Sequence, residues 1–237
     1  MRASVPSTPR RRAPSPVSEA VEPAPLVLAT RSAGKIRELT SLFAAEGIAV
    51  ESVESLGLAE ESAEEGIECY DSFAANAEAK ARWFAARLPG RVVFAEDSGL
   101  VVDALGGAPG VHSKRWAQVM ARGRALEEGN NAALLRALEG VEHRAARYRC
   151  VAVCVAGDAR WRGEGAVEGR ITTVAKGTGG FGYDPYFDSV ELGKTFGEAS
   201  AEEKARVSHR ARAVGALLAS GGLALRAVVR GGLDARR

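Results

Sequence analysis

Residues 26–50 read LVLATRSAGKIRELTSLFAAEGIAV, and this stretch decides the fold class of the 237-residue chain. The apolar run 26–29 has the length and composition of a buried strand, and residues 31–34 are small or polar, as in a turn. Apolar residues then recur at helical spacing, at Ile36, Leu39, Leu42 and Phe43. Gly47 suits a helix C-cap, and residues 48–50 begin a second strand. This strand–loop–helix–strand unit predicts an α/β fold.

Further helices and strands are expected along the chain. The periodicity of apolar residues predicts helices at 73–88, 130–139 and 201–219, and strands at 91–95, 148–156 and 161–174. The last two strands are expected to pair antiparallel through the turn at Gly157 and Asp158. The acidic stretch 56–71 is expected to be irregular.

The composition is that of a soluble globular protein, with 46% hydrophobic and 26% charged residues. No apolar run approaches the roughly 18 residues that span a bilayer, so no membrane association is expected. Residues 1–25 hold six of the nine prolines, which predicts a disordered tail. We expect one domain over residues 26–220, followed by an extension of unknown role at 221–237.

The formal charge of +2 lies entirely in the tail, so residues 26–237 sum to zero. A nucleic-acid-binding domain normally carries a concentrated basic excess. We therefore expect no nucleic-acid partner for the folded domain. The chain also lacks the apolar core of a secretion signal, which favours a cytoplasmic location.

Three cysteines, Cys69, Cys150 and Cys154, cannot all pair with one another. The run from Cys150 to Cys154 has the pattern of a buried strand with both thiols on one face. A metal site requires more ligands and shorter spacing. We expect buried, reduced cysteines.

The segment 30–35 (TRSAGK) lies between the first strand and its helix. A helix N-terminus presents unpaired N–H groups and a partial positive charge, which suits phosphate, and Lys35 adds a full charge. The segment is not a Walker A loop, because Ala29 and Ile36 stand where a Gly and a Ser or Thr are required. Strand–turn–Lys helices without a ligand are also common.

A pair of carboxylates, Glu96 and Asp97, follows the strand predicted at 91–95. Adjacent side chains on a strand point to opposite faces, so only one of them can face a given cleft. At a strand end, such a carboxylate can hold Mg²⁺ or take a proton from water. The same residues suit a capping turn, because Asp and Ser favour such positions.

The glycine-rich segment 176–185 reads KGTGGFGYDP. Glycine lets the backbone approach a ligand closely, while Phe181 and Tyr183 offer flat faces to a ring and Asp184 an acceptor to its polar edge. The glycines formally match a dinucleotide fingerprint, but that motif requires a helix to open directly on them, and the residue before Pro185 is disfavoured in a helix. A purely structural glycine turn is the alternative.

The last predicted helix carries a third group of polar residues. Lys204 and Ser208 lie one helical turn apart and share a face. His209 and Arg210 follow directly, and together they are suited to contact base edges and phosphate. A single histidine of this kind is also often structural.

In their order and spacing, these segments resemble the inosine triphosphate pyrophosphatase family, which hydrolyses deaminated purine nucleoside triphosphates. The matching motifs are residues 30–35, Phe73 with Asn76 and Lys80, and residues 97–100, 105–111, 177–185, 194–198 and 208–210. The resemblance implies an elongated mixed β-sheet flanked by helices, in two lobes with a nucleotide cleft between them. It also implies a homodimer.

The resemblance further implies a role for each matching residue. Asp97 would be the catalytic proton acceptor, and with Glu64 it would bind Mg²⁺, while Ser98 would contact the substrate. The triphosphate would be held by Thr30, Arg31, Ser32, Ala33, Gly34 and Lys35. The purine would be enclosed by Phe181, Gly182, Tyr183 and Asp184, and its 6-oxo group would be read by Lys204, His209 and Arg210. A site that donates hydrogen bonds to O6 rejects adenine, because its donors would be left unpaired.

Four features depart from the family pattern. Ser32 stands where the family usually has Asn, Ala75 stands where an acidic residue is usual, and Glu96 stands where the family has the first of two paired aspartates. The connection 65–72 is longer than usual, which leaves the choice of metal ligand open between Glu64 and Glu65. Two alternatives therefore stand beside this function: a pyrophosphatase for modified pyrimidine nucleotides, and a nucleotide- or nucleic-acid-binding protein without turnover.

Overall fold

The computed structural model describes residues 24–117 and 123–231. Most of the tail predicted at 1–25 lies outside the described residues, and so does the end of the C-terminal extension, residues 232–237.

One mixed sheet of seven strands forms the centre of the molecule, in the order β2-β1-β3-β4-β5-β6-β7. β1 runs parallel to β2 and β3, and the remaining pairs are antiparallel. The strands are β1 (Leu26–Leu28), β2 (Val50–Ser52), β3 (Val93–Val102), β4 (Ala145–Ala156), β5 (Ala159–Ile171), β6 (Phe187–Ser189) and β7 (Lys194–Thr195). β4 and β5 pair directly through the predicted turn, which confirms that hairpin.

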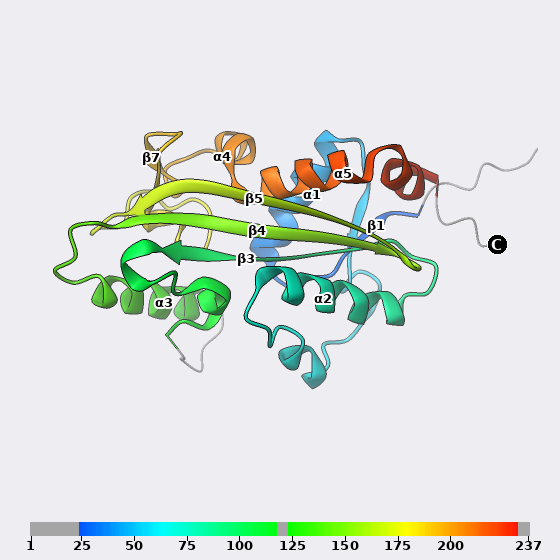
Figure 1. Ribbon diagram of the computed structural model, residues 1–237, viewed down its shortest axis with the longest axis horizontal. Coiled ribbons are helices and arrows are strands. Elements are labelled where there is room, and N and C mark those ends of the chain that lie inside the picture. Colours follow the sequence, from blue (N-terminus) through cyan, green and yellow to red (C-terminus); the bar gives the residue numbers. More distant parts are fainter. Residues whose placement is uncertain (1–23, 118–122, 232–237) are drawn as a thin grey trace, which may run out of the picture.

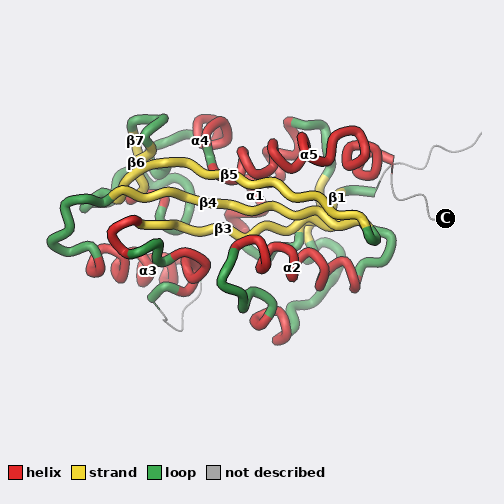
Figure 2. The backbone as a smooth tube through the Cα atoms, in the orientation of Figure 1, coloured by secondary structure: helices red, strands yellow, loops and turns green. Residues whose placement is uncertain are grey.

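Helices cover both faces of this sheet (Figure 1). They are α1 (Ala33–Ala45), α2 (Phe73–Arg87), α3 (Arg124–Ala137), α4 (Ala201–Val207) and α5 (His209–Gly231). The α1 and α5 helices lie on one face and α2 on the other (Figure 2), while α3 packs beside the far end of β3, where its Leu134 joins Leu100 and Val102. The predicted α/β class with a mixed sheet flanked by helices is therefore confirmed.

The molecule has two lobes; the first has a hydrophobic cluster on each face of the sheet, and the second has a separate one. Near β1 and β2, alternate residues of β3 point to opposite faces: Phe94 packs with α1 and α5, while Val93 and Ala95 pack with α2. Toward the far ends of the long strands, Leu100 and Val102 enter a separate cluster with α3, Phe187 and Phe196. The strands β3, β4 and β5 belong to both lobes (Figure 2).

The lobes meet where β1 stops. Leu28 is paired with Phe94, and β1 ends there, whereas β3 continues to Val102 because β4 pairs with it throughout. The strand predicted to end at Ala95 is thus longer than expected, and Glu96 and Asp97 lie within it. They lie immediately beyond the end of β1, so one edge of β3 is free of a neighbouring strand at these two residues.

The predicted helix 201–219 is two helices. α4 ends at Val207, and Ser208, in extended conformation, caps the start of α5 by accepting from Ala211 N at 3.1 Å. A capping serine competes with helical hydrogen bonding, which explains the break. As a result, His209 and Arg210 lie in the first turn of a new helix rather than in the middle of a long one.

The cysteine prediction is confirmed for two residues and wrong for the third. Cys150 and Cys154 are buried on the same face of β4, whereas Cys69 is exposed in the irregular segment before α2. None of the helices in the described ranges is long and apolar enough to cross a membrane.

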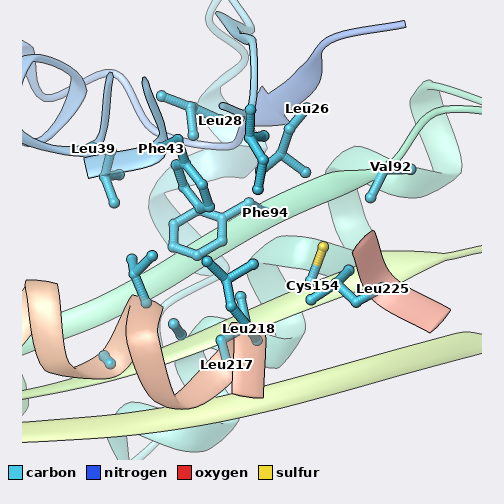
Figure 3. Close-up of a cluster of buried hydrophobic side chains, with 14 of the residues drawn as sticks. Leu26, Leu28, Leu39, Phe43, Val92, Phe94, Cys154, Leu217, Leu218 and Leu225 are labelled. Carbon is cyan, nitrogen blue, oxygen red and sulfur yellow. The ribbon is translucent and has the colours of Figure 1, made fainter. Parts of the chain in front are cut away.

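The extension predicted from residue 221 begins as a continuation of α5, which runs to Gly231. Leu225 is 1% exposed and packs in the core with Leu26, Val92 and Cys154 (Figure 3). Arg226 pairs with Glu46 at the end of α1, 3.0 Å apart at the surface. The extension therefore covers the end of the first lobe's core.

Replacing Leu225 by Ala is expected to lower the free energy of unfolding by about 2–5 kcal/mol, because it removes buried methyl groups and leaves a cavity. Arg226→Ala is the matched control in the same turn, and it should cost less than about 1 kcal/mol because its ion pair is exposed. Urea denaturation of both variants measures the difference. Equal losses would mean that the extension does not contribute to the core.

Candidate active site

The loop between β1 and α1 presents the start of a helix at the junction of the lobes. Ser32 is the N-cap of α1, and its hydroxyl accepts from Lys35 N at 3.4 Å. Its own N–H donates to Thr30 Oγ1 at 3.2 Å. The first turn of α1 contains no acidic residue. The positive end of α1, with no acidic residue nearby in its first turn and with Lys35 beside it, is therefore suited to bind an anion.

Lys35 and Arg210 share one buried carboxylate. Glu96 is 1% exposed, and its Oε1 accepts from Lys35 Nζ at 3.0 Å and from Arg210 Nε at 3.3 Å. Burial acts to raise the pKa of Glu96, but the charges of Lys35 and Arg210 outweigh it and hold the pKa well below its ordinary value. Glu96 is therefore ionised. It ties the start of α1 to the start of α5 across β3.

A second carboxylate, Glu38, links Arg210 to Lys204. Its Oε1 accepts from Lys204 Nζ at 2.6 Å, and its Oε2 pairs with Arg210 Nη1. Lys204 also pairs with Asp184, and Arg210 Nη2 donates to Ser98 Oγ at 3.2 Å. Sequence reasoning missed Glu38, although a residue three positions after Lys35 on a helix lies on nearly the same face.

Asp97 points to the opposite face of β3, toward α2, as expected for adjacent residues on a strand. Its Oδ2 accepts from Asn76 Nδ2 at 3.0 Å. Burial is the largest influence on the Asp97 pKa and raises it, and the nearby Glu68 acts in the same direction. Lys35 and Lys80 act against this shift without overcoming it. Asp97 is thus a more basic carboxylate than an exposed one.

The acidic segment before α2 places two glutamates differently. Glu64, in the 3₁₀ turn Ser62–Gly66, pairs with Arg31 at 2.6 Å. Glu68 pairs with Lys80, and its charge acts on Asp97. Arg31, expected on phosphate, is thus occupied by Glu64 and by the carbonyls of Leu58 and Ala59. Glu68 is the glutamate of this segment whose charge reaches Asp97, and sequence reasoning missed it.

The glycine-rich loop at 177–184 brings Phe181 against the loop at 30–35, between β1 and α1. A Cβ atom on Gly34 would lie 2.6 Å from the Phe181 ring, so only glycine permits this approach. Lys204 Nζ and Arg210 Cζ lie 5.0 and 5.6 Å from the centre of the same ring. Asp184 holds the loop, since its Oδ2 accepts from Phe181 N at 2.8 Å.

The other residues expected around the base lie differently. Tyr183 is 5% exposed and donates its hydroxyl to Ser113 O at 2.7 Å, so its ring belongs to the core of the second lobe and is not available for stacking. The Gly182 carbonyl accepts from Asn131 of α3 at 3.0 Å. A local aromatic pattern does not tell which ring faces the cleft, and the predicted contact of Tyr183 with the base stays a prediction.

His209 is buried and stacks on Tyr148, with ring centres 4.6 Å apart. Burial lowers the pKa of His209 well below its ordinary value, and the charges of Arg210 and Lys204 add to the effect. The imidazole is therefore neutral at physiological pH. Its Nδ1 is buried without a hydrogen-bond partner within the described part of the chain.

Charges of both signs balance at this junction. Five carboxylates meet four cations, and the exposed Lys114 adds a fifth cation at the edge. The carboxylates are those of Glu38, Glu68, Glu96, Asp97 and Asp184, and the four inner cations are Lys35, Lys80, Lys204 and Arg210. Such a site can bind a polyanion only if carboxylates release their cations or if further positive charge arrives with the ligand.

The model of the Ham1 family matches residues 26–220 of the chain. The chain belongs to the Ham1 family. It is similar to the dITP/XTP pyrophosphatase of Geobacillus kaustophilus, with 46% identity over 193 residues, which cover 80% of this chain and 90% of the relative. It is also similar to the dITP/XTP pyrophosphatase of Ralstonia nicotianae, with 45% identity over 196 residues, covering 81% and 94%.

Solved structures of the family have the same fold. The Staphylococcus aureus Ham1 protein superposes with a TM-score of 0.67 at 33% identity, covering 83% of this chain and 97% of that one. A nucleoside-triphosphatase, dITP/XTP pyrophosphatase, from Mycobacterium abscessus superposes with a TM-score of 0.62 at 34% identity, covering 82% and 98%. The resemblance found in the sequence motifs is confirmed.

The two neighbouring carboxylates are expected to differ in how much they contribute to stability. Glu96→Gln should cost about 3–5 kcal/mol of unfolding free energy at pH 7, because it leaves Lys35 and Arg210 buried without their counter-ion. Since the pKa of Glu96 is lowered, this cost should shrink as pH falls from 4.5 through the lowered value. Asp97→Asn should cost nothing at pH 7, because the raised pKa of Asp97 means that its ionised form is penalised in the folded state.

Denaturant titrations of both variants between pH 3 and 7 make this comparison. A pH-independent loss for Glu96→Gln, or a marked loss for Asp97→Asn at pH 7, would contradict the assignment of charges.

Proposed function

We propose that this protein hydrolyses deaminated purine nucleoside triphosphates (dITP, ITP and XTP) to the monophosphate and pyrophosphate, and so removes them from the nucleotide pool. The observation that carries the proposal is that the loop at the start of α1, the cation Lys35 and the basic carboxylate Asp97 meet where the two lobes join. The chain that carries them is 46% identical to a protein named dITP/XTP pyrophosphatase. We expect this protein to act in the cytoplasm.

In this proposal the triphosphate binds at the N-terminus of α1. The free N–H groups of the loop and the side chain of Lys35 donate hydrogen bonds to phosphate oxygens, and Ser98 adds a hydroxyl. Arg210 is linked to both Glu38 and Glu96, so it can shift toward phosphate without losing all of its partners. These groups stabilise the charge that develops on the departing pyrophosphate.

Asp97 accepts the proton in the chemical step. A water molecule attacks a phosphorus of the anhydride linkage between the α- and β-phosphates, the bridging P–O bond breaks, and the proton of the water passes to Asp97. Its raised pKa makes it a better base, and the hydrogen bond from Asn76 fixes the orientation of its carboxylate.

A divalent cation, Mg²⁺, fits the carboxylate side of the site. Glu68 and Asp97 lie close enough for the charge of one to raise the pKa of the other, and oxygen ligands of this kind suit Mg²⁺. The balanced charges of the junction also leave no surplus positive charge for a triphosphate. When bound, the cation would supply this charge and polarise the phosphate. We thus propose Glu68 and Asp97 as ligands, in place of the Glu64 expected from the sequence, because Glu64 is paired with Arg31.

The base is proposed to lie beside Phe181, with Lys204 and His209 at its polar edge. Lys204 is a donor, and it suits the 6-oxo group of hypoxanthine or xanthine but not the amino group of adenine. Asp184 acts indirectly by holding Phe181 and Lys204 in place.

We extend the proposal to a homodimer. Val174 and Val190 are 66% and 72% exposed, and both line a cleft of about 810 Å³ between the ends of β5 and β6. Large exposed apolar side chains on a cleft rim are typical of association surfaces. Light scattering would distinguish a dimer from a monomer of 24.8 kDa.

The purified protein is expected to release pyrophosphate from dITP and XTP at least 100-fold more efficiently than from dATP or dTTP, because only the 6-oxo purines satisfy the donors. Steady-state kinetics on this panel with Mg²⁺ provides the measurement. The Asp97→Asn variant should be folded and inactive, which excludes a contaminating enzyme. A preference for thymidine or uridine nucleotides would favour a pyrimidine pyrophosphatase instead, and binding without turnover a nucleotide-binding protein.

Metal binding can be tested with two glutamates of the same segment. Glu68→Gln should raise the Mg²⁺ concentration needed for half-maximal activity at least tenfold, and it should weaken binding of Mn²⁺ measured by calorimetry, because it removes one oxygen ligand. Glu64→Gln is the matched control and should leave both values unchanged. If Glu64→Gln weakened metal binding and Glu68→Gln did not, Glu64 would be the metal ligand instead.

A further inference from the structure

Beneath the site, a buried thiol contacts the carboxylate that joins Lys35 to Arg210. Cys150 lies on β4 opposite Ser98 and is 1% exposed. Its Sγ lies 3.4 Å from Glu96 Oε2, within hydrogen-bond range for a thiol donor. The other oxygen of Glu96, Oε1, is the one that accepts from both Lys35 and Arg210.

We propose that Cys150 is a positioning residue: its thiol donates to Glu96 Oε2, and thereby keeps Lys35 and Arg210 available to the phosphates of the substrate. The inference rests on the proposed function, because it assigns those two cations to phosphate.

The physical argument concerns how the two oxygens of Glu96 share their partners. An ionised, buried carboxylate needs donors on both oxygens, since an unpaired one is costly. With the thiol on Oε2, the two cations share the single oxygen Oε1. Without the thiol, the carboxylate is free to rotate and meet Lys35 and Arg210 with one oxygen each. Such tighter pairing would withdraw both cations from an incoming triphosphate.

The geometry supports a positional role and excludes a reactive one. Cys150 is enclosed between β3, β5 and α5, and burial followed by the charge of Glu96 raises the pKa of its thiol. The group therefore stays protonated, which is the form that donates a hydrogen bond.

The chain contains a matched control four residues away. Cys154 lies on the same face of the same strand, is equally buried, and belongs to the same hydrophobic cluster. It lies among apolar side chains such as Leu225 and Val92 (Figure 3). Removing either sulfur costs a similar packing interaction, but only Cys150 contacts Glu96.

The experiment compares Cys150→Ala, Cys150→Ser and Cys154→Ala in the full chain. Steady-state kinetics with dITP and Mg²⁺ gives KM and kcat, and calorimetry with inorganic tripolyphosphate gives binding without turnover. Cys150→Ala should raise KM and weaken tripolyphosphate binding about five- to tenfold, the effect of one ordinary hydrogen bond, with kcat changed less than about twofold. Cys150→Ser retains a donor and should restore both values. Cys154→Ala should leave both unchanged.

Thermal unfolding of the three variants checks that the alanine variants lose similar stability. Equal KM and binding constants for Cys150→Ala and Cys154→Ala would overturn the inference, and so would failure of the serine variant to rescue. If the parent protein binds tripolyphosphate but does not hydrolyse dITP, the proposed function fails, and the calorimetric comparison still decides the role of Cys150. A parent that binds no tripolyphosphate would overturn both.

Discussion

The buried charge of Glu96 is the constraint on which the rest of the site depends. Lys35 begins the first helix of the fold and Arg210 the last one, and both are cations that would repel each other without a shared counter-ion. Removing a carboxylate from water is costly, and good geometry with several donors is needed to recover that cost. By meeting this requirement, Glu96 fixes the starts of α1 and α5 on one strand of the sheet, where both helices present cations to the same place.

The features that the sequence predicted are those with a local signal. The unit 26–50, the hairpin through Gly157 and the helix at 73–88 follow from periodicity and turn residues within a few positions. Lys35, Asp97 and Arg210 could be singled out as candidates because each stands in a short motif. Glu38 was missed because its role comes from contacts with Lys204 and Arg210, which lie 166 and 172 residues away. The break at Ser208 was missed because the helical pattern continues across it.

The acidic segment shows a different limit. Glu64 and Glu68 are the same residue type in one irregular stretch, so composition cannot rank them. Their tertiary contacts distinguish them: Glu64 pairs with Arg31, which is 33 residues away in the sequence, whereas Glu68 pairs with Lys80 on α2. Tyr183 is a similar case, because the core of the second lobe decides which way its ring points.

The passage of β3, β4 and β5 through both lobes has a consequence for how the molecule moves and melts. Ladder hydrogen bonds pair β3 with β4 from Val93 to Val102 and β4 with β5 from Ala145 to Ala156 without a gap, so the chain offers no hinge between its two cores. Rotation of one lobe against the other would have to be spread along the strands as a change of twist. Rearrangement around a ligand therefore falls to the loops at 30–35 and 177–184. For the same reason we expect the two lobes to unfold together as a single cooperative unit.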